Sequence, residues 1–198
     1  MVNDFAIAGV IFEGDDGFIL GQFSGDDEIA DDIFAARGDL FSVPAKNGPT
    51  RNLTQSPGTH DREPAWSPDG RQIAFSMEDY VAKTSSVCIK MRRDDQRVCL
   101  DNGGRRSYLP IWSPDGKWLA VSDHPPEGPR GIFLVSVERG ERRRLTSNTA
   151  GLDYSPAFSP DGRHLAYVSC PGMVSSCDVY LLELASDLVP RARPRRVT

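Results

Sequence analysis

A turn motif that recurs three times at a constant interval restricts the fold of this chain more than any other feature. It reads AWSPDG at 65–70, IWSPDG at 111–116 and AFSPDG at 157–162. Proline suits the first corner of a type I turn, and glycine suits the left-handed residue that completes a three-residue hairpin loop. The motif therefore predicts three equivalent β-hairpins. The residues of the repeat are Trp66, Pro68, Asp69, Gly70, Trp112, Pro114, Asp115, Gly116, Phe158, Pro160, Asp161 and Gly162.

The segments between the turns also repeat, with a period of 46 residues. Short alternating runs follow each turn (RQIAFS, KWLAVS, RHLAYVS), and a second set comes later (SSVCIKM, RGIFLVSV, CDVYLLEL). A tetrad led by arginine then opens the next unit, at 51–54, 97–100, 143–146 and 195–198. Alternation and β-branched residues indicate about four strands a unit, and this period is typical of β-propeller blades. We expect the aromatic residue before each turn to pack between sheets rather than to contact a ligand.

The repeat predicts an all-β, propeller-like arc of about four four-stranded blades. Residues 1–50 are expected to form a degenerate first blade, with a hairpin around Asp16 and Gly17, and 51–96 and 97–142 a blade each. Residues 143–198 are expected to form a blade plus the start of a further one, because the final RRVT resembles a new tetrad. Since propellers have four to eight blades, we expect the arc to be incomplete, with open sheet edges that favour self-association.

Composition and charge fit a globular chain of 198 residues with a net charge of −5. No apolar run approaches the roughly 18 residues of a membrane helix, and no basic segment precedes the first apolar run as in a signal peptide. Arginines cluster at 92–93, 142–144 and 195–196, as on a nucleic-acid-binding surface, but acidic residues are interleaved with them. We therefore favour solvated strand ends and expect no nucleic-acid partner.

The sequence offers no catalytic constellation and no metal motif. Its three histidines, His60, His124 and His164, fall in or near predicted turns, and Ser24 lacks the G-x-S-x-G context of a hydrolase. The acidic stretches near the N-terminus lack the spaced carboxylates of a calcium loop. These patterns predict a chain that is not an enzyme, has no cofactor and has no metal site.

Four cysteines form two pairs that are close in sequence. Cys88 and Cys99 flank a predicted hairpin, and Cys170 and Cys177 flank a predicted loop. Neither pair has C-x-x-C spacing, which argues against zinc or thioredoxin chemistry. Two local disulfides would indicate a periplasmic or other extracytoplasmic compartment, whereas four buried thiols would suit the cytoplasm. Both readings stay open at this stage.

The stretch RNLT followed by REPAWSPDGRQIAFS resembles the repeat of TolB-like and tricorn-type β-propellers. The resemblance covers about residues 38–198. Residues 38–70 look especially like the propeller of tricorn-type peptidases, and 97–198 look more like propeller tails of bacterial winged-helix regulators or kinases. Two departures are that the tetrad at 97–100 has lost its Leu-Thr and that residues 1–37 match no blade well.

This resemblance implies a non-enzymatic module that binds a protein or peptide through its loops. An accessory, substrate-gating propeller of a serine peptidase is the alternative, its catalytic domain lying outside this chain. The sensor tail of a transcriptional regulator is a third. The loops that follow the second strand of each blade are the predicted binding positions. They contain Glu78, Asp79, Tyr80, His124 and Glu127.

Overall fold

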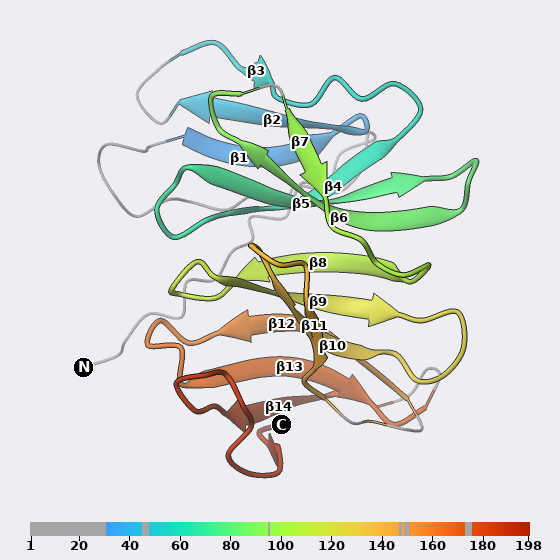
Figure 1. Ribbon diagram of the computed structural model, residues 1–198, viewed down its shortest axis with the longest axis vertical. Coiled ribbons are helices and arrows are strands. Elements are labelled where there is room, and N and C mark those ends of the chain that lie inside the picture. Colours follow the sequence, from blue (N-terminus) through green and yellow to red (C-terminus); the bar gives the residue numbers. More distant parts are fainter. Residues whose placement is uncertain (1–30, 45–47, 95, 147, 149–150, 173–175) are drawn as a thin grey trace. The chain divides into compact units, whose positions relative to one another are not determined.

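The computed structural model describes residues 31–44, 48–94, 96–146, 148, 151–172 and 176–198. Within these residues the regular structure consists of β-strands, as the sequence predicted, and helices are absent (Figure 1). Contacts divide the chain into two compact units, Met1–Leu100 and Asp101–Thr198. The hairpin predicted around Asp16 and Gly17 lies outside the described residues.

Consecutive antiparallel strands form four groups, which we call blades 1 to 4. Blade 1 contains β1 (Asp31–Ala36), β2 (Asp39–Pro44) and β3 (Arg51–Asn52), and blade 2 contains β4 (His60–Trp66), β5 (Gln72–Asp79), β6 (Thr84–Met91) and β7 (Arg97–Cys99). Blade 3 contains β8 (Arg106–Trp112), β9 (Trp118–His124), β10 (Gly131–Ser136) and β11 (Arg142–Arg144). Blade 4 contains β12 (Leu152–Phe158), β13 (His164–Cys170), β14 (Asp178–Glu183) and β15 (Arg195–Arg196).

The arginine-led tetrads lie at the end of a blade rather than at its start. β3 pairs with β2, β7 with β6, β11 with β10, and β15 with β14. The boundaries at 51, 97 and 143 therefore mark the sequence period, whereas strand pairing assigns each tetrad to the blade before it. The final RRVT follows this pattern, because Arg195 and Arg196 pair with β14 rather than open a further blade.

The threonine of the tetrad ties the last strand of a blade to the strand before it. Its Oγ1 accepts the backbone N–H of Leu40 in blade 1, of Ile132 in blade 3 and of Val179 in blade 4, at 3.0, 3.1 and 2.9 Å. Blade 2 keeps the adjacent leucine, since the Leu100 N–H donates to the Val87 carbonyl at 2.9 Å. The tetrad at 97–100 is thus displaced by one residue and has lost only its threonine. The Cys88–Cys99 disulfide joins the same two strands there.

A left-handed residue followed by proline interrupts the first strand of blades 2, 3 and 4. Glu63, Leu109 and Ser155 have φ values of 55°, 53° and 52°, and the strand register shifts at each of them. The proline after each residue has no N–H to offer the ladder, so a bulge leaves no backbone donor unpaired there. The bulge changes which residues lie opposite each other on the first two strands.

Apolar side chains pack between neighbouring blades within each unit. In the first unit, Ile33 and Leu40 of blade 1 pack with Ile73 and Phe75 of blade 2, and Trp66 joins this cluster. In the second unit, the core contains Ala120, Ile132 and Leu134 of blade 3 and Leu165, Tyr167 and Leu182 of blade 4; Phe158 packs against it. The repeated aromatic residues Trp66 and Phe158 thus contribute to packing between blades.

Candidate functional site

The three SPDG turns share one hydrogen-bonded geometry. The N–H of Gly70, Gly116 and Gly162 donates to the serine carbonyl three residues earlier at 2.8–2.9 Å, and the φ of these glycines is 64°, 69° and 69°. In each turn the serine Oγ also donates to the aspartate Oδ1 at 2.6 Å. This bond and backbone N–H donors stabilise the charged carboxylate and lower the pKa of Asp69 and Asp161. The serine, which sequence reasoning did not single out, stabilises the turn through its hydroxyl and its carbonyl.

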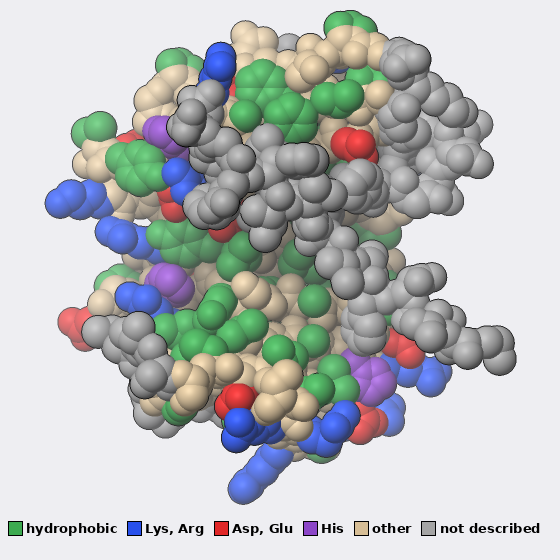
Figure 2. Space-filling model, turned by 180° about the vertical axis from the view of Figure 1, so that it is seen from behind, with side chains coloured by type: hydrophobic (Ala, Val, Ile, Leu, Met, Phe, Trp, Pro, Cys, Tyr) green, Lys and Arg blue, Asp and Glu red, His purple; other side chains and the backbone are tan. Residues whose placement is uncertain are grey.

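At the other end of the strands, Tyr80 is an exposed aromatic ring held by its neighbours. The residue is 54% exposed, and its hydroxyl accepts a hydrogen bond from Arg62 Nη2 at 2.8 Å. Its ring lies edge-on to His60, with ring centroids 4.7 Å apart. Asp79 Oδ1 accepts the N–H groups of the next two loop residues, Val81 and Ala82, at 2.9 and 2.8 Å. These contacts present the Tyr80 ring to solvent in one orientation. Histidine side chains reach the surface beside basic and apolar ones (Figure 2).

Two of the predicted rim residues in the first unit thus contact the same arginine. Glu78 Oε2 lies 3.7 Å from Arg62 Nε, and the two residues opposite each other at the start of β4 and the end of β5 are His60 and Glu78. The structure therefore gathers His60, Arg62, Glu78 and Tyr80 into one group, which we call the Tyr80 cluster. Asp79 contributes through the loop backbone.

In the second unit, His124 lies at the end of β9 and contacts Tyr108, with ring centroids 5.2 Å apart. Burial, together with the positive charges of Arg130 and Arg106, lowers the pKa of His124 against the opposing effect of Asp123. Glu127 lies in the exposed loop between β9 and β10. The predicted residues of this loop are therefore near one another in sequence, but the structure does not bring the exposed Glu127 into the contact between His124 and Tyr108.

We expect the lowered pKa of His124 to make residues 101–198 less stable in acid. The unfolded chain binds a proton near pH 6.5, and the folded chain binds it only at lower pH. Stability is therefore fully present above about pH 6.5 and falls as the pH drops from there toward the folded pKa. Urea unfolding at pH 7.5 and 5.5 should show that His124→Gln gains stability relative to the parent chain at the lower pH. An unchanged difference between the two pH values would contradict this expectation.

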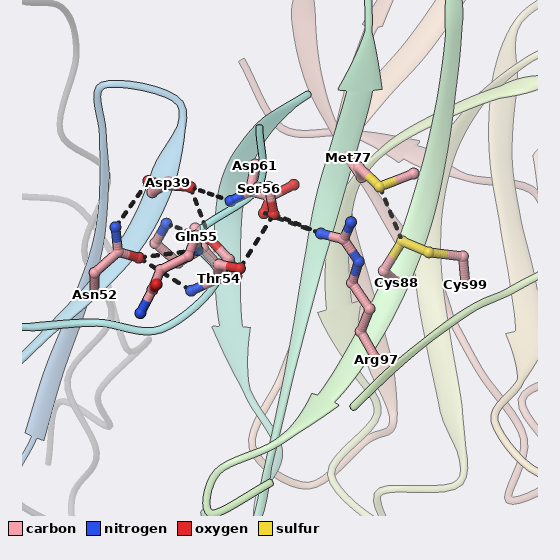
Figure 3. A network of polar contacts seen from close by, with 11 residues as sticks. Asp39, Asn52, Thr54, Gln55, Ser56, Asp61, Met77, Cys88, Arg97 and Cys99 are labelled. Carbon is pink, nitrogen blue, oxygen red and sulfur yellow. Dashed lines mark hydrogen bonds and ion pairs between the residues drawn. A yellow bond between two sulfur atoms is a disulfide. The ribbon is translucent and has the colours of Figure 1, made fainter. Parts of the chain in front are cut away.

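A buried network of polar side chains joins blade 1 to blade 2 in the first unit (Figure 3). Asp61 is fully buried, its Oδ2 accepts the Ser56 hydroxyl at 2.7 Å, and Arg97 Nη1 lies 3.5 Å from the same oxygen. Arg97 also donates to Ser56 Oγ at 2.6 Å. Burial raises the pKa of Asp61, and the hydrogen bonds and Arg97 offset it only in part. Asp39 extends the network, since its carboxylate accepts the Ser56 N–H at 2.8 Å.

Blades 3 and 4 each contain a serine–aspartate pair with a buried aspartate, and the two residues are exchanged between the strands. In blade 3, Ser107 on β8 lies opposite Asp123 on β9 and donates to it, and Arg142 Nη1 donates to the other carboxylate oxygen at 3.0 Å. In blade 4, Asp153 on β12 lies opposite Ser169 on β13 and accepts its hydroxyl at 2.6 Å. Each aspartate has protein partners and little access to solvent, so these pairs anchor the strand ends rather than bind a ligand.

A groove of about 640 Å³ lies in the second unit, at the turn end of the strands. Its lining includes Asp115, Asp161, His164, Glu183 and Arg191. His164 is thus the histidine that faces a concave surface, while His124 and Glu127 are absent from that lining. Acidic and basic side chains both line the groove, so its charge does not select one kind of ligand.

No group of three or more metal-ligating side chains occurs among the residues that the structure describes. No helix there is long and apolar enough to cross a membrane.

The cysteines pair as Cys88–Cys99 and Cys170–Cys177, with sulfur–sulfur distances of 2.00 and 2.02 Å. Disulfides persist in oxidising compartments, so this pairing is consistent with an extracytoplasmic location.

Comparison with protein families identifies the repeat. The model of the TolB beta propeller domain matches residues 64–191. The chain belongs to this family. The TolB-like fold agrees with the open antiparallel sheets of the structure and with the four-strand grouping of blades 2, 3 and 4. No curated protein matches the sequence.

Solved structures of TolB proteins have the same fold. A putative TolB from Agrobacterium tumefaciens has a TM-score of 0.67 at 19% identity, and the match covers 90% of this chain and 60% of that one. TolB from Acinetobacter baumannii has a TM-score of 0.66 at 16% identity, covering 91% and 49%. A puromycin-hydrolyzing peptidase from Mycobacterium tuberculosis has a TM-score of 0.66 at 21% identity, covering 90% and 31%. This TolB-like chain therefore spans about half to three-fifths of the TolB structures that it matches.

Sequence reasoning missed the residues that hold the predicted positions in place. His60 and Arg62 precede the turn, on β4, and their link to Tyr80 depends on the β4–β5 register. Asp61, Ser107 and Asp153 occupy the same position of the 46-residue repeat, near the start of the first strand of each blade. A polar residue repeated at this position could have indicated the buried polar contacts from the sequence.

Proposed function

We propose that this TolB-like chain is a non-enzymatic module that binds a protein or peptide partner through the Tyr80 cluster. One observation carries the proposal: Tyr80 is more than half exposed, and its side chain is nevertheless held by Arg62 and His60. Tyrosine and arginine are enriched among the residues that dominate binding energy at interfaces. An aromatic ring that is already ordered loses less conformational entropy on binding than a free one.

The neighbouring side chains add to the binding surface. Val81 is 92% exposed beside Tyr80, so an apolar side chain and an aromatic ring face solvent together. Arg62 and Glu78 have side chains that are 51% and 18% exposed, and they supply a donor and an acceptor at the edge of the apolar part. An apolar centre with a polar edge is the arrangement of a protein–protein interface. A partner segment with an apolar side chain and a carboxylate for Arg62 would fit it.

The role of accessory propeller in a peptidase is the second candidate. Its support is the fold similarity to a chain titled a puromycin-hydrolyzing peptidase, of which the matched part covers 31%. A catalytic domain in the same gene would favour this role, and the Tyr80 cluster would then contact peptide substrate or the hydrolase domain.

A peptide library displayed on phage and selected on the immobilised 198-residue chain tests binding directly. We expect Tyr80→Ala to weaken the selected peptides at least about tenfold, as for a residue at the centre of an interface. Fluorescence anisotropy with a labelled peptide measures the loss. Val189→Ala is the matched control, since Val189 is an exposed apolar residue elsewhere in the chain. Failure to select any peptide, or equal binding by Tyr80→Ala, would overturn the proposal.

A further inference from the structure

Blade 4 has an apolar face on the side that points away from blade 3. Ala166 lies opposite Leu181, and Val168 lies opposite Val179, across β13 and β14. Successive side chains of a strand point to opposite faces, and the alternate residues Leu165, Tyr167 and Leu182 pack in the core with blade 3. The four side chains of the first set are only partly buried. We call them, with the 53% exposed Val197 beside them, the acceptor face.

The equivalent face of blade 3 is completely covered. Ala120 lies 46 residues before Ala166 and pairs with Leu134, as Ala166 pairs with Leu181. Ala120, Ile132 and Leu134 are all 0% exposed, because blade 4 packs on them. A face of this kind in this chain is therefore built to receive the side chains of a neighbouring blade.

Blade 1 carries the side chains that such a face receives. Phe34 and Phe41 lie opposite each other on β1 and β2, with stacked rings 5.6 Å apart. Tyr167 and Tyr180 lie opposite each other on β13 and β14, with stacked rings 5.9 Å apart. Tyr167 is 5% exposed in the core with blade 3, and Tyr180 packs against that core.

The phenylalanine pair has no equivalent burial in its own blade. Phe34 and Phe41 are partly exposed, whereas the alternate residues Ile33 and Leu40 are 0% exposed against blade 2. We call Phe34 and Phe41 the donor face. By the same strand alternation, it lies on the side of blade 1 that points away from blade 2.

The two faces have borders of opposite charge. Asp32 and Asp39 lie on the donor side of blade 1, because each alternates with a residue that faces blade 2. On blade 4, Arg195 lies opposite Leu181, on the acceptor side. Asp31 and Arg196 lie on the opposite sides and pair with Arg92 and Asp178. Opposite charges speed the encounter of two surfaces and fix their orientation.

We propose that a second copy of this chain covers the acceptor face of blade 4. Its Phe34–Phe41 pair would pack there as Tyr167 and Tyr180 pack on blade 3. The contact is head to tail, so each copy offers one donor and one acceptor face. Two such contacts close a ring if the rotation between copies allows it. Burial of two phenylalanine rings and four aliphatic side chains removes apolar surface from water, which favours association.

Three variants of the 198-residue chain test this pairing by sedimentation velocity. We expect the parent chain to form an oligomer, and both Phe41→Asp and Leu181→Asp to sediment as monomers. An equimolar mixture of these two variants should associate again, because one supplies an intact acceptor face and the other an intact donor face. Val98→Asp is the control, since Val98 is 67% exposed on β7 and belongs to neither face; it should behave as the parent chain does.

Two results would overturn the proposal. The parent chain could remain monomeric over the whole accessible concentration range, which would mean that another segment covers these faces. The mixture could remain monomeric although both variants retain the circular dichroism of the parent. Val168→Asp replaces Leu181→Asp if the latter does not fold, and the same outcomes apply to it. Neither result bears on peptide binding at Tyr80.

Discussion

Replacing Asp123 with alanine is expected to lower the free energy of unfolding of residues 101–198 by about 3–5 kcal/mol. Asp123 is 0% exposed, and it accepts hydrogen bonds from Ser107 and from Arg142 Nη1. Arg105 Nε also lies 3.6 Å from its carboxylate. Removing the carboxylate leaves Arg142, which is 13% exposed, without its buried counter-charge. Arg105, at 36% exposed, can turn to water, which favours the lower end of the range.

Urea unfolding followed by tryptophan fluorescence measures the loss, and hydrogen exchange locates it. Exchange should rise in β8, β9 and β11, because Asp123 joins side chains from these three strands. Glu127→Ala is the matched control, since it removes an exposed carboxylate from the loop after β9. A decrease in the free energy of unfolding of less than about 1 kcal/mol would mean that Asp123 contributes no more than a surface ion pair. That result would contradict its role in holding the strand ends.

Blade 4 supplies a second test of the same pair, because it already contains the exchanged arrangement. Asp153 and Ser169 occupy the positions of Ser107 and Asp123, 46 residues later. We expect Asp123→Ser to be destabilising and the added change Ser107→Asp to recover part of the loss, since the carboxylate returns to the same strand pair.

Local chemistry explains which parts of the fold the sequence could predict. The SPDG turn is specified by four consecutive residues, and the glycine conformation and hairpin pairing follow from them. The period of the repeat also follows from the sequence, but the phase does not. A tetrad that lies between two blades can pair with either of them. The hydrogen bonds from Leu40, Ile132 and Val179 to the tetrad threonines show that each tetrad belongs to the preceding blade.

For the candidate site, the sequence predicted which loop carries the binding residues but not which residues contact them. Tyr80 was placed after the second strand of its blade because it follows the alternating run. Its partner Arg62 lies 18 residues earlier, and the register between the two strands shifts within β4. Alternation alone cannot show such a bulge, so the contact between Arg62 and Tyr80 required the structure.

A second large effect is expected in the first unit, where Phe75→Ala should cost about 3–5 kcal/mol of its free energy of unfolding. Phe75 is 0% exposed and packs in the cluster that contains Ile33 and Leu40 of blade 1 and Ile73 beside it on β5. Truncation removes a whole ring from the contact between two blades. The strands on either side are held by backbone hydrogen bonds and cannot collapse fully into the space, so a cavity remains.

Hydrogen exchange distinguishes this cavity from a local effect on β5. If Phe75 joins the two blades, its loss should speed exchange in β1 and β2 of blade 1 as well as in β5, although blade 1 is unchanged in sequence. Met91→Ala is the matched control, because Met91 is in the same blade but 44% exposed, and it should cost well under half as much. Faster exchange confined to β5 would mean that blade 1 does not depend on this ring. The dependence of blade 1 on Phe75 matters for the donor face, because Ile33 and Leu40 alternate along β1 and β2 with Phe34 and Phe41. Loss of the contact on one side of these strands would therefore disturb the aromatic pair on the other.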